Sequence, residues 1–172
     1  MNLPNRLTMF RVMLIPLFLS LLPVSRIGAV GVFALACFTD WLDGFIARRQ
    51  NLITNFGKLM DPLADKLLVA AALVAMVELG CIPAWIAILI ISREFLVTGL
   101  RLAALEKRVV IAAGYWAKWK TAVTMVMIGF VLADFPGAAA YYAGQTLIWL
   151  SVGLTVASAA EYIARNYKLL KS

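Results

Sequence analysis

The chain has 172 residues, 63% hydrophobic and 15% charged, with a mean hydropathy of +0.90 and a net charge of +7. Soluble domains carry about 25% charged residues, so this composition excludes an ordinary soluble domain and predicts an integral membrane protein. The sequence contains no histidine. A general base must therefore be a carboxylate, a lysine or a tyrosine, and a metal site must be built from oxygen ligands, because the two cysteines match no metal spacing.

Apolar runs separated by turn residues predict an all-α fold of six transmembrane helices, since each crossing needs about 20 residues. The predicted spans are residues 5–24, 26–49, 57–79, 82–106, 116–133 and 139–166. Short turns follow the first, third and fifth spans, and longer loops follow the second and fourth. The length predicts a single transmembrane domain over residues 1–172. No small-residue cleavage site follows the first span, which is expected to be a retained helix.

The basic residues indicate how the helices are oriented. Of the 16 lysines and arginines, only Arg26 falls on the side of the three short turns. The positive-inside rule then predicts a multi-pass protein with both termini and the two longer loops in the cytoplasm. Topology and attraction to anionic headgroups explain this one-sided charge, and no nucleic-acid partner is expected.

The second and third spans carry two pairs of aspartates near their cytoplasmic ends. The second span ends in "TDWLDGFIARR", where Asp40 and Asp43 are three residues apart, and the third opens with "GKLMDPLADK", where Asp61 and Asp65 are four apart. Each pair shares a helical face, and antiparallel helices joined by a short connection are neighbours. The four carboxylates are therefore predicted to converge.

Four carboxylates near the membrane require a counter-charge, because each costs about 2.5 to 3.5 kcal/mol at the centre of a span. An all-oxygen cluster favours Mg, Mn or Ca. Helix capping or salt bridges with neighbouring basic residues is the alternative for any single aspartate. Capping or salt bridges explain the whole set of four aspartates less well. Gly44 and Gly57 leave room beside the aspartates, and the guanidinium of Arg48 is suited to bind a phosphate. The spacing predicts a dimetal site facing the cytoplasm, with a cleft for a phosphorylated ligand.

The same residues resemble the complete signature of the CDP-alcohol phosphatidyltransferases, D-x2-D-G-x2-A-R-x8-G-x3-D-x3-D. The eight fixed positions are Asp40, Asp43, Gly44, Ala47, Arg48, Gly57, Asp61 and Asp65. The resemblance extends over "NLPNRLTMFRV", "ISREFLVTGLR" and "WAKWKT", to about residue 121. It implies six transmembrane helices around a polar cavity open to the cytoplasm, in a bacterial inner-membrane protein that is usually a homodimer.

The wider chain is similar to family members whose acceptor is sn-glycerol 3-phosphate. The resemblance implies that a hydroxyl of this acceptor attacks the β-phosphate of CDP-diacylglycerol, giving phosphatidylglycerol phosphate and CMP. The four aspartates would hold two divalent cations, Mg or Mn, and Asp65 would also accept the proton. Residues similar to positions that bind CDP-diacylglycerol are Asn5, Thr8, Gly44, Ala47, Arg48, Thr54 and Gly57, with helix capping an equal alternative for Asn5 and Thr8.

The acceptor is a dianion, so two or three basic groups should converge on its phosphate. The candidates on or near the fourth and fifth spans are Arg93, Arg101, Arg108, Lys118 and Lys120. A structural ion pair between Arg93 and Glu94 is the alternative for the first of these, and topology alone is the alternative for the two lysines. Trp116 and Trp119 are expected to anchor the fifth span in the membrane interface.

Three other functions remain open from the sequence. The signature fixes the CDP-lipid half of the reaction, so a sibling enzyme could use inositol phosphate, serine or another alcohol. An intramembrane prenyltransferase also binds Mg through aspartate-rich motifs but requires no cytidine. A cation transporter could use the aspartates as its ion site, although the chain has no repeated half.

Overall fold

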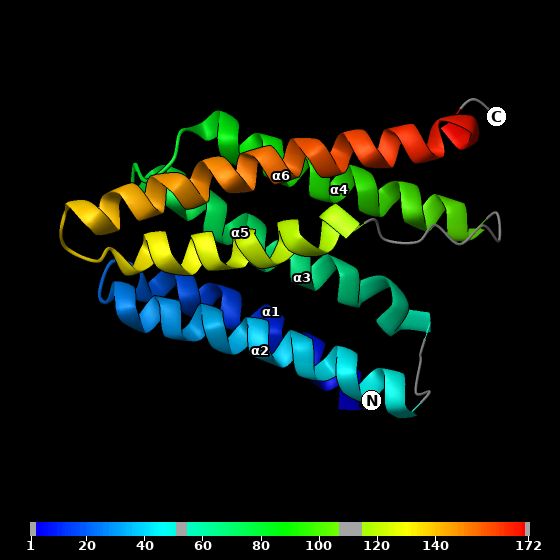
Figure 1. Ribbon diagram of the computed structural model, residues 1–172. Coiled ribbons are helices and arrows are strands. Elements are labelled where there is room, and N and C mark those ends of the chain that lie inside the picture. Colours follow the sequence, from blue (N-terminus) through cyan, green and yellow to red (C-terminus); the bar gives the residue numbers. More distant parts are fainter. Residues whose placement is uncertain (1–2, 51–54, 107–114, 171–172) are drawn as a thin grey trace. The chain divides into compact units, whose positions relative to one another are not determined.

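Six α-helices form the part of the chain that the computed structural model describes, residues 3–50, 55–106 and 115–170 (Figure 1). They are α1 (Leu3–Leu21), α2 (Arg26–Gln50), α3 (Asn55–Glu78), α4 (Ala84–Glu106), α5 (Tyr115–Ala133) and α6 (Ala138–Leu170). Side chains are described for residues 9–40, 64, 66–102, 104, 116, 117 and 119–165. The predicted all-α fold and its six helices are confirmed, with boundaries that differ by a few residues.

The first of two compact units contains α1, α2, α3 and the segment Leu132–Asp134. Within it α1 packs against both α2 and α3, and Figure 1 shows α1 and α2 side by side, joined by a short turn. The rings of Phe18 and Phe33 join these two helices, with their centroids 5.9 Å apart. Because both rings are almost fully buried, this contact anchors the α1–α2 hairpin.

Helix boundaries in this unit follow local capping chemistry. The sequence pattern predicts a first span to residue 24, but α1 ends at Leu21 because Pro23 disfavours helical geometry in the residue before it. The hydroxyl of Ser25 then accepts a hydrogen bond from the backbone N–H of Gly28 at 3.1 Å, and so caps the start of α2.

Gly80 ends α3 in a left-handed conformation. Its φ is +69°, and the N–H groups of Gly80 and Cys81 donate to the carbonyls of Val77 and Met76, at 3.0 and 2.8 Å. This is the Schellman arrangement, which satisfies carbonyls at the end of a helix and favours glycine at the left-handed position. The sequence ends the third span at residue 79, one residue beyond the observed end, because glycine is a strong stop signal.

An ion pair joins the start of α2 to the segment that follows α5. Arg26 Nη1 lies 2.5 Å from Asp134 Oδ2, and Asp134 has a φ of +50°. Cys81 lies near this pair in the turn between α3 and α4. Burial raises the pKa of its thiol, Arg26 lowers it and Asp134 raises it. The net effect is a higher pKa, so the thiol stays protonated at neutral pH.

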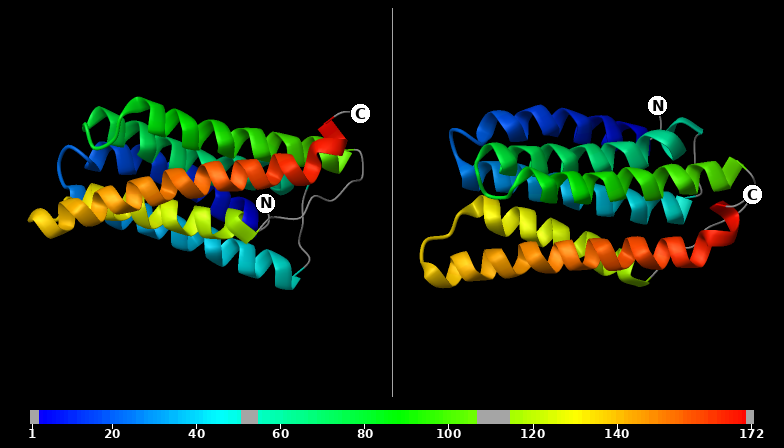
Figure 2. Two further views of the ribbon diagram at one scale, coloured as in Figure 1. Left: turned by 45° about the horizontal axis from the view of Figure 1, so that its top comes forward. Right: turned by 90° about the horizontal axis from the view of Figure 1, so that it is seen from above.

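The second compact unit contains α4, most of α5, and α6. Figure 2 shows its successive helices running in alternating directions, and α4 packs against α6. The buried face of α6 recurs every three or four residues and is largely polar: Ile148, Ser151, Thr155, Ser158 and Tyr162. Thr124 of α5 and Ser151 of α6 share a hydrogen bond of 2.8 Å between their hydroxyls. Small hydroxyl side chains let two helices approach closely, as in membrane helix pairs.

One segment among the described residues is long and apolar enough to cross a membrane by composition alone. It is Ala138–Arg165 of α6, with a mean hydropathy of 1.5. Among the residues whose side chains are described, the apolar stretches Met9–Leu21 and Trp119–Ala133 are shorter. Charged residues inside the other helices interrupt their apolar runs, for example Arg11 in α1 and Arg93 in α4. Six membrane crossings therefore remain a prediction.

Candidate active site

The four signature aspartates lie on two successive helices of the first unit. Asp40 and Asp43 are on α2, and Asp61 and Asp65 are on α3. The two helices contact each other. The side chain of Asp40 is described, whereas those of the other three aspartates lie outside the described residues. The convergence of the four carboxylates therefore stays a prediction.

Asp40 forms a salt bridge with an arginine of α1. Arg11 Nη1 lies 2.9 Å from Asp40 Oδ1, and the Arg11 side chain is 1% exposed while that of Asp40 is 36% exposed. A buried guanidinium requires a negative partner because its desolvation costs several kcal/mol. The side chain of Asp40 is partly exposed, so it binds the buried Arg11 and is also accessible to solvent.

Arg11 is a residue of the site that the sequence interpretation missed. It lies in "MFRVML", in the middle of an apolar run, and an ionisable residue inside such a run usually has a buried partner. That signal identifies Arg11 as a candidate for pairing. It does not identify Asp40 as the partner, because the pairing depends on how α1 packs against α2.

The donor chemistry at Asp40 fits a divalent cation. An ionised carboxylate accepts through two oxygens with about four lone-pair sites and has no hydrogen-bond donor, which suits it to bind a cation. The described carboxylate is partly exposed, and hard cations such as Mg²⁺ prefer oxygen ligands. Arg11 would fix the orientation of this ligand.

The residues predicted to contact CDP-diacylglycerol lie mostly at positions whose side chains are outside the described set. Their backbones are placed on three helices: Asn5 and Thr8 on α1, Gly44, Ala47 and Arg48 on α2, and Gly57 on α3. Thr54 falls outside the described residues. All seven remain predictions.

Two of the predicted acceptor-binding residues meet at one carboxylate in the second unit. Glu94 Oε1 accepts a hydrogen bond from Arg93 Nη1 at 2.9 Å and a short one from Lys120 Nζ. The side chains of Arg93, Glu94 and Lys120 are 9%, 12% and 2% exposed. The Arg93–Glu94 ion pair, the structural alternative to acceptor binding by Arg93, is present, and Lys120 of α5 joins it. These three residues are called the α4–α5 triad below.

The position of Glu94 in the sequence indicates that it pairs with basic residues. It is the single acidic residue between Glu78 and Glu106, and it lies among basic residues on two consecutive helices. Pairing with Arg93 can be anticipated because the two residues are adjacent, but the bond to Lys120 spans 26 positions and joins two different helices.

Of the other three acceptor candidates, only Arg101 has a described side chain. Arg101 lies on α4 seven residues after Glu94, which puts the two on the same helical face. Its Nε is buried and has no hydrogen-bond partner among the described residues. Arg108 falls outside the described residues, and Lys118 is on α5 with a side chain outside them. Their convergence on one phosphate stays a prediction.

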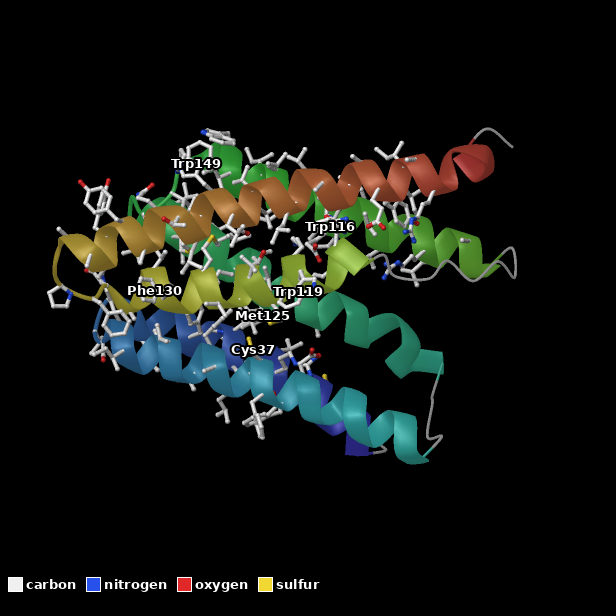
Figure 3. The ribbon with its side chains drawn as sticks, in the orientation of Figure 1. Cys37, Trp116, Trp119, Met125, Phe130 and Trp149 are labelled. Atoms are coloured by element: carbon white, nitrogen blue, oxygen red, sulfur yellow. The ribbon has the colours of Figure 1, made fainter. Side chains whose placement is uncertain are left out.

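Tryptophans mark the first turns of α5. Trp116 and Trp119 project there (Figure 3), and each is about half exposed. Trp149 on α6 is also exposed, and its ring centroid lies 6.1 Å from that of Trp85 on α4. Exposed tryptophans on apolar helices are typical of membrane–water interfaces, which fits the anchoring predicted for the start of α5.

Comparison with known proteins decides the family. The model of the CDP-alcohol phosphatidyltransferase family matches residues 1–157. The chain belongs to this family. Membership implies a membrane enzyme. It favours a phosphatidyltransferase over the prenyltransferase and the cation transporter that the sequence left open.

Curated relatives match nearly the whole chain. A Bacillus subtilis protein named CDP-diacylglycerol–glycerol-3-phosphate 3-phosphatidyltransferase is 40% identical over 99% of this chain and 98% of its own. An Escherichia coli protein of the same name is 40% identical over 95% and 93%. A Mycobacterium tuberculosis protein named probable phosphatidylglycerophosphate synthase is 39% identical over 95% and 81%. The likeness therefore covers both the signature and the helices that carry the basic residues.

Proposed function

We propose that this chain transfers the phosphatidyl group of CDP-diacylglycerol to sn-glycerol 3-phosphate, giving phosphatidylglycerol phosphate and CMP. The observation that carries the proposal is the near full-length likeness to relatives named for this reaction. The signature aspartates lie on α2 and α3 and the basic residues on α4 and α5, and these residues would supply the chemistry that the reaction requires.

The reaction is a displacement at phosphorus. The acceptor hydroxyl forms a bond to the β-phosphorus of CDP-diacylglycerol, and the bond from that phosphorus to the bridging oxygen breaks. CMP leaves with the bonding electrons. The hydroxyl proton passes to the Asp65 carboxylate, and no histidine is available for that role.

The signature residues would bind the metal ions and the nucleotide. Asp40, Asp43, Asp61 and Asp65 would hold two divalent cations, Mg or Mn. When bound, such ions neutralise the charge that develops on the attacking and leaving oxygens. Arg11 would keep Asp40 in one orientation. The seven residues predicted to contact CDP-diacylglycerol would bind its nucleotide, with Arg48 on a phosphate.

The finer architecture belongs to the same proposal. All six helices would cross the bacterial inner membrane as a single domain around a polar cavity open to the cytoplasm, with both termini on that side. The buried hydroxyls of α5 and α6 and the exposed tryptophans support packing within a bilayer. The working form would be a homodimer.

Replacing Arg101 with alanine should weaken binding of the acceptor selectively. Loss of a hydrogen bond between charged groups costs about 1.5 to 3 kcal/mol, so Arg101→Ala should raise the KM for glycerol 3-phosphate at least tenfold. The KM for CDP-diacylglycerol should change less than twofold. Steady-state kinetics with each substrate varied in turn measures both values.

Arg165→Ala is the matched control for this variant. Arg165 is also on a helix of the second unit, but its side chain is 68% exposed and pairs with Glu161 on the same helix. Exposed pairs of this kind contribute little, so both KM values should stay unchanged. Equal effects of Arg101→Ala on the two substrates would remove Arg101 from the acceptor pocket.

The choice of acceptor is tested by CMP release from CDP-diacylglycerol. Purified protein would be offered glycerol 3-phosphate, inositol phosphate and serine in separate reactions, each with Mg, with Mn and with a chelator. The proposal requires metal-dependent release with glycerol 3-phosphate alone. Release with another alcohol would keep the signature chemistry and overturn the assignment of the acceptor.

A further inference from the structure

Glu94 is a partly buried acidic residue that contacts two buried cations, in a region that is proposed to bind an anion. One of its oxygens accepts hydrogen bonds from both Arg93 and Lys120. Since both donors lie within bonding distance of a single oxygen atom, the guanidinium and the ammonium converge on one point. The contact also joins α4 to α5, so the geometry is fixed between two helices.

The charges of the triad sum to +1, from two cations and one carboxylate. Two buried cations alone would repel each other and each would require several kcal/mol of desolvation. The carboxylate offsets that cost and holds both groups in place before a ligand arrives. A preorganised site does not have to order its side chains on binding, which improves affinity.

Arg93 retains a donor that faces no acceptor in the described part of the chain. Its side chain is 9% exposed, and its Nε is buried without a hydrogen-bond partner there. Arg101, on the same helix, has a buried Nε in the same condition. Buried guanidinium N–H groups are rarely left without partners, so these two atoms point to an anionic ligand with several oxygens.

We infer that Glu94 is a positioning residue: it holds Arg93 and Lys120 for the phosphate of the acceptor, and does not itself contact the acceptor. This inference rests on the proposed function. A phosphate monoester offers three oxygens, which suits two cations held at one point better than a single surface charge does. The alternative is that the triad only joins α4 to α5.

Glu94→Gln tests the inference because glutamine keeps the size of the side chain and removes its charge. In the full-length protein in phospholipid vesicles, the KM for glycerol 3-phosphate should rise at least tenfold, whereas the KM for CDP-diacylglycerol should stay within twofold. Glu94→Asp keeps the charge on a shorter side chain and should recover part of the loss. A triad that only joins helices would instead lower the amount of folded enzyme and leave both KM values unchanged.

A double variant separates the effect of Glu94 on acceptor binding from its effect on the charge of the triad. Glu94→Gln with Lys120→Met keeps a net charge of +1 in the triad, as in the natural protein. Its thermal midpoint should therefore lie closer to that of the natural protein than the midpoint of Glu94→Gln does, yet its KM for glycerol 3-phosphate should stay raised. An unchanged KM in the double variant would show that neither residue serves acceptor binding.

The natural protein in the same assay distinguishes the two possible failures. If it releases no CMP with glycerol 3-phosphate, the proposed function is wrong and the inference fails with it. If it is active and Glu94→Gln raises both KM values equally or neither, the function stands and the positioning role is wrong.

Discussion

Asp65→Asn should lower kcat by at least a thousandfold while the folded protein still binds CDP-diacylglycerol. Asparagine has nearly the same shape but cannot accept the proton of the attacking hydroxyl. Loss of a general base alone costs about a hundredfold to ten-thousandfold in rate. The same change removes one anionic oxygen ligand from the proposed metal site, which adds to the loss. Single-turnover CMP release and binding of the nucleotide lipid measure the two properties separately.

Asp134→Asn provides the matched control for the loss of a carboxylate. Asp134 is outside the signature and its side chain is 64% exposed in the pair with Arg26. Exposed ion pairs contribute little, so turnover should stay near that of the natural protein. A tenth or more of the normal rate in Asp65→Asn would remove Asp65 from the role of base.

Asp40→Asn should lower both turnover and stability, because Asp40 is a proposed metal ligand and the carboxylate partner of a buried arginine. Arg11 is 1% exposed, and a hydrogen bond between charged groups contributes about 1.5 to 3 kcal/mol. The lower part of that range applies because Asp40 is itself 36% exposed. For a chain of this size, the thermal midpoint should fall by about 3 to 8 °C.

The double variant Arg11→Met with Asp40→Asn separates the two effects. Methionine fills the space of the arginine methylene groups and carries no charge, so the double variant leaves no unpaired cation in the interior. The midpoint should therefore recover, while turnover should remain as low as in Asp40→Asn. Recovery of turnover would show that Asp40 serves only to neutralise Arg11. A single variant with an unchanged midpoint would show that the pair contributes nothing to stability.

The helices were predictable from the sequence because local signals set them. Apolar runs place each helix, and Gly80 ends α3 one residue from the predicted position. The discrepancy at the end of α1 arises from Pro23, whose effect on the preceding residues outweighs the apolar pattern there. Crossing of the membrane by all six helices stays a prediction, because among the described residues only Ala138–Arg165 is long and apolar enough to span by composition.

The candidate site was predictable where it depends on spacing along one helix. Positions 40 and 43 both lie within α2, and their spacing of three residues follows from the sequence whatever that helix packs against. The contacts of Arg11 with Asp40 and of Lys120 with Glu94 were not predictable, because each joins two helices whose rotation about their own axes is set by packing. A buried charge indicates that a partner exists without identifying it.

The most direct test of the proposed function follows labelled glycerol 3-phosphate into lipid while CMP release is measured in the same reaction. The proposal predicts that label enters the lipid fraction in a one-to-one ratio with CMP, and only when CDP-diacylglycerol and Mg or Mn are both present. CMP release without label in the lipid, or labelled lipid formed without CDP-diacylglycerol, would contradict transfer of the phosphatidyl group to this acceptor.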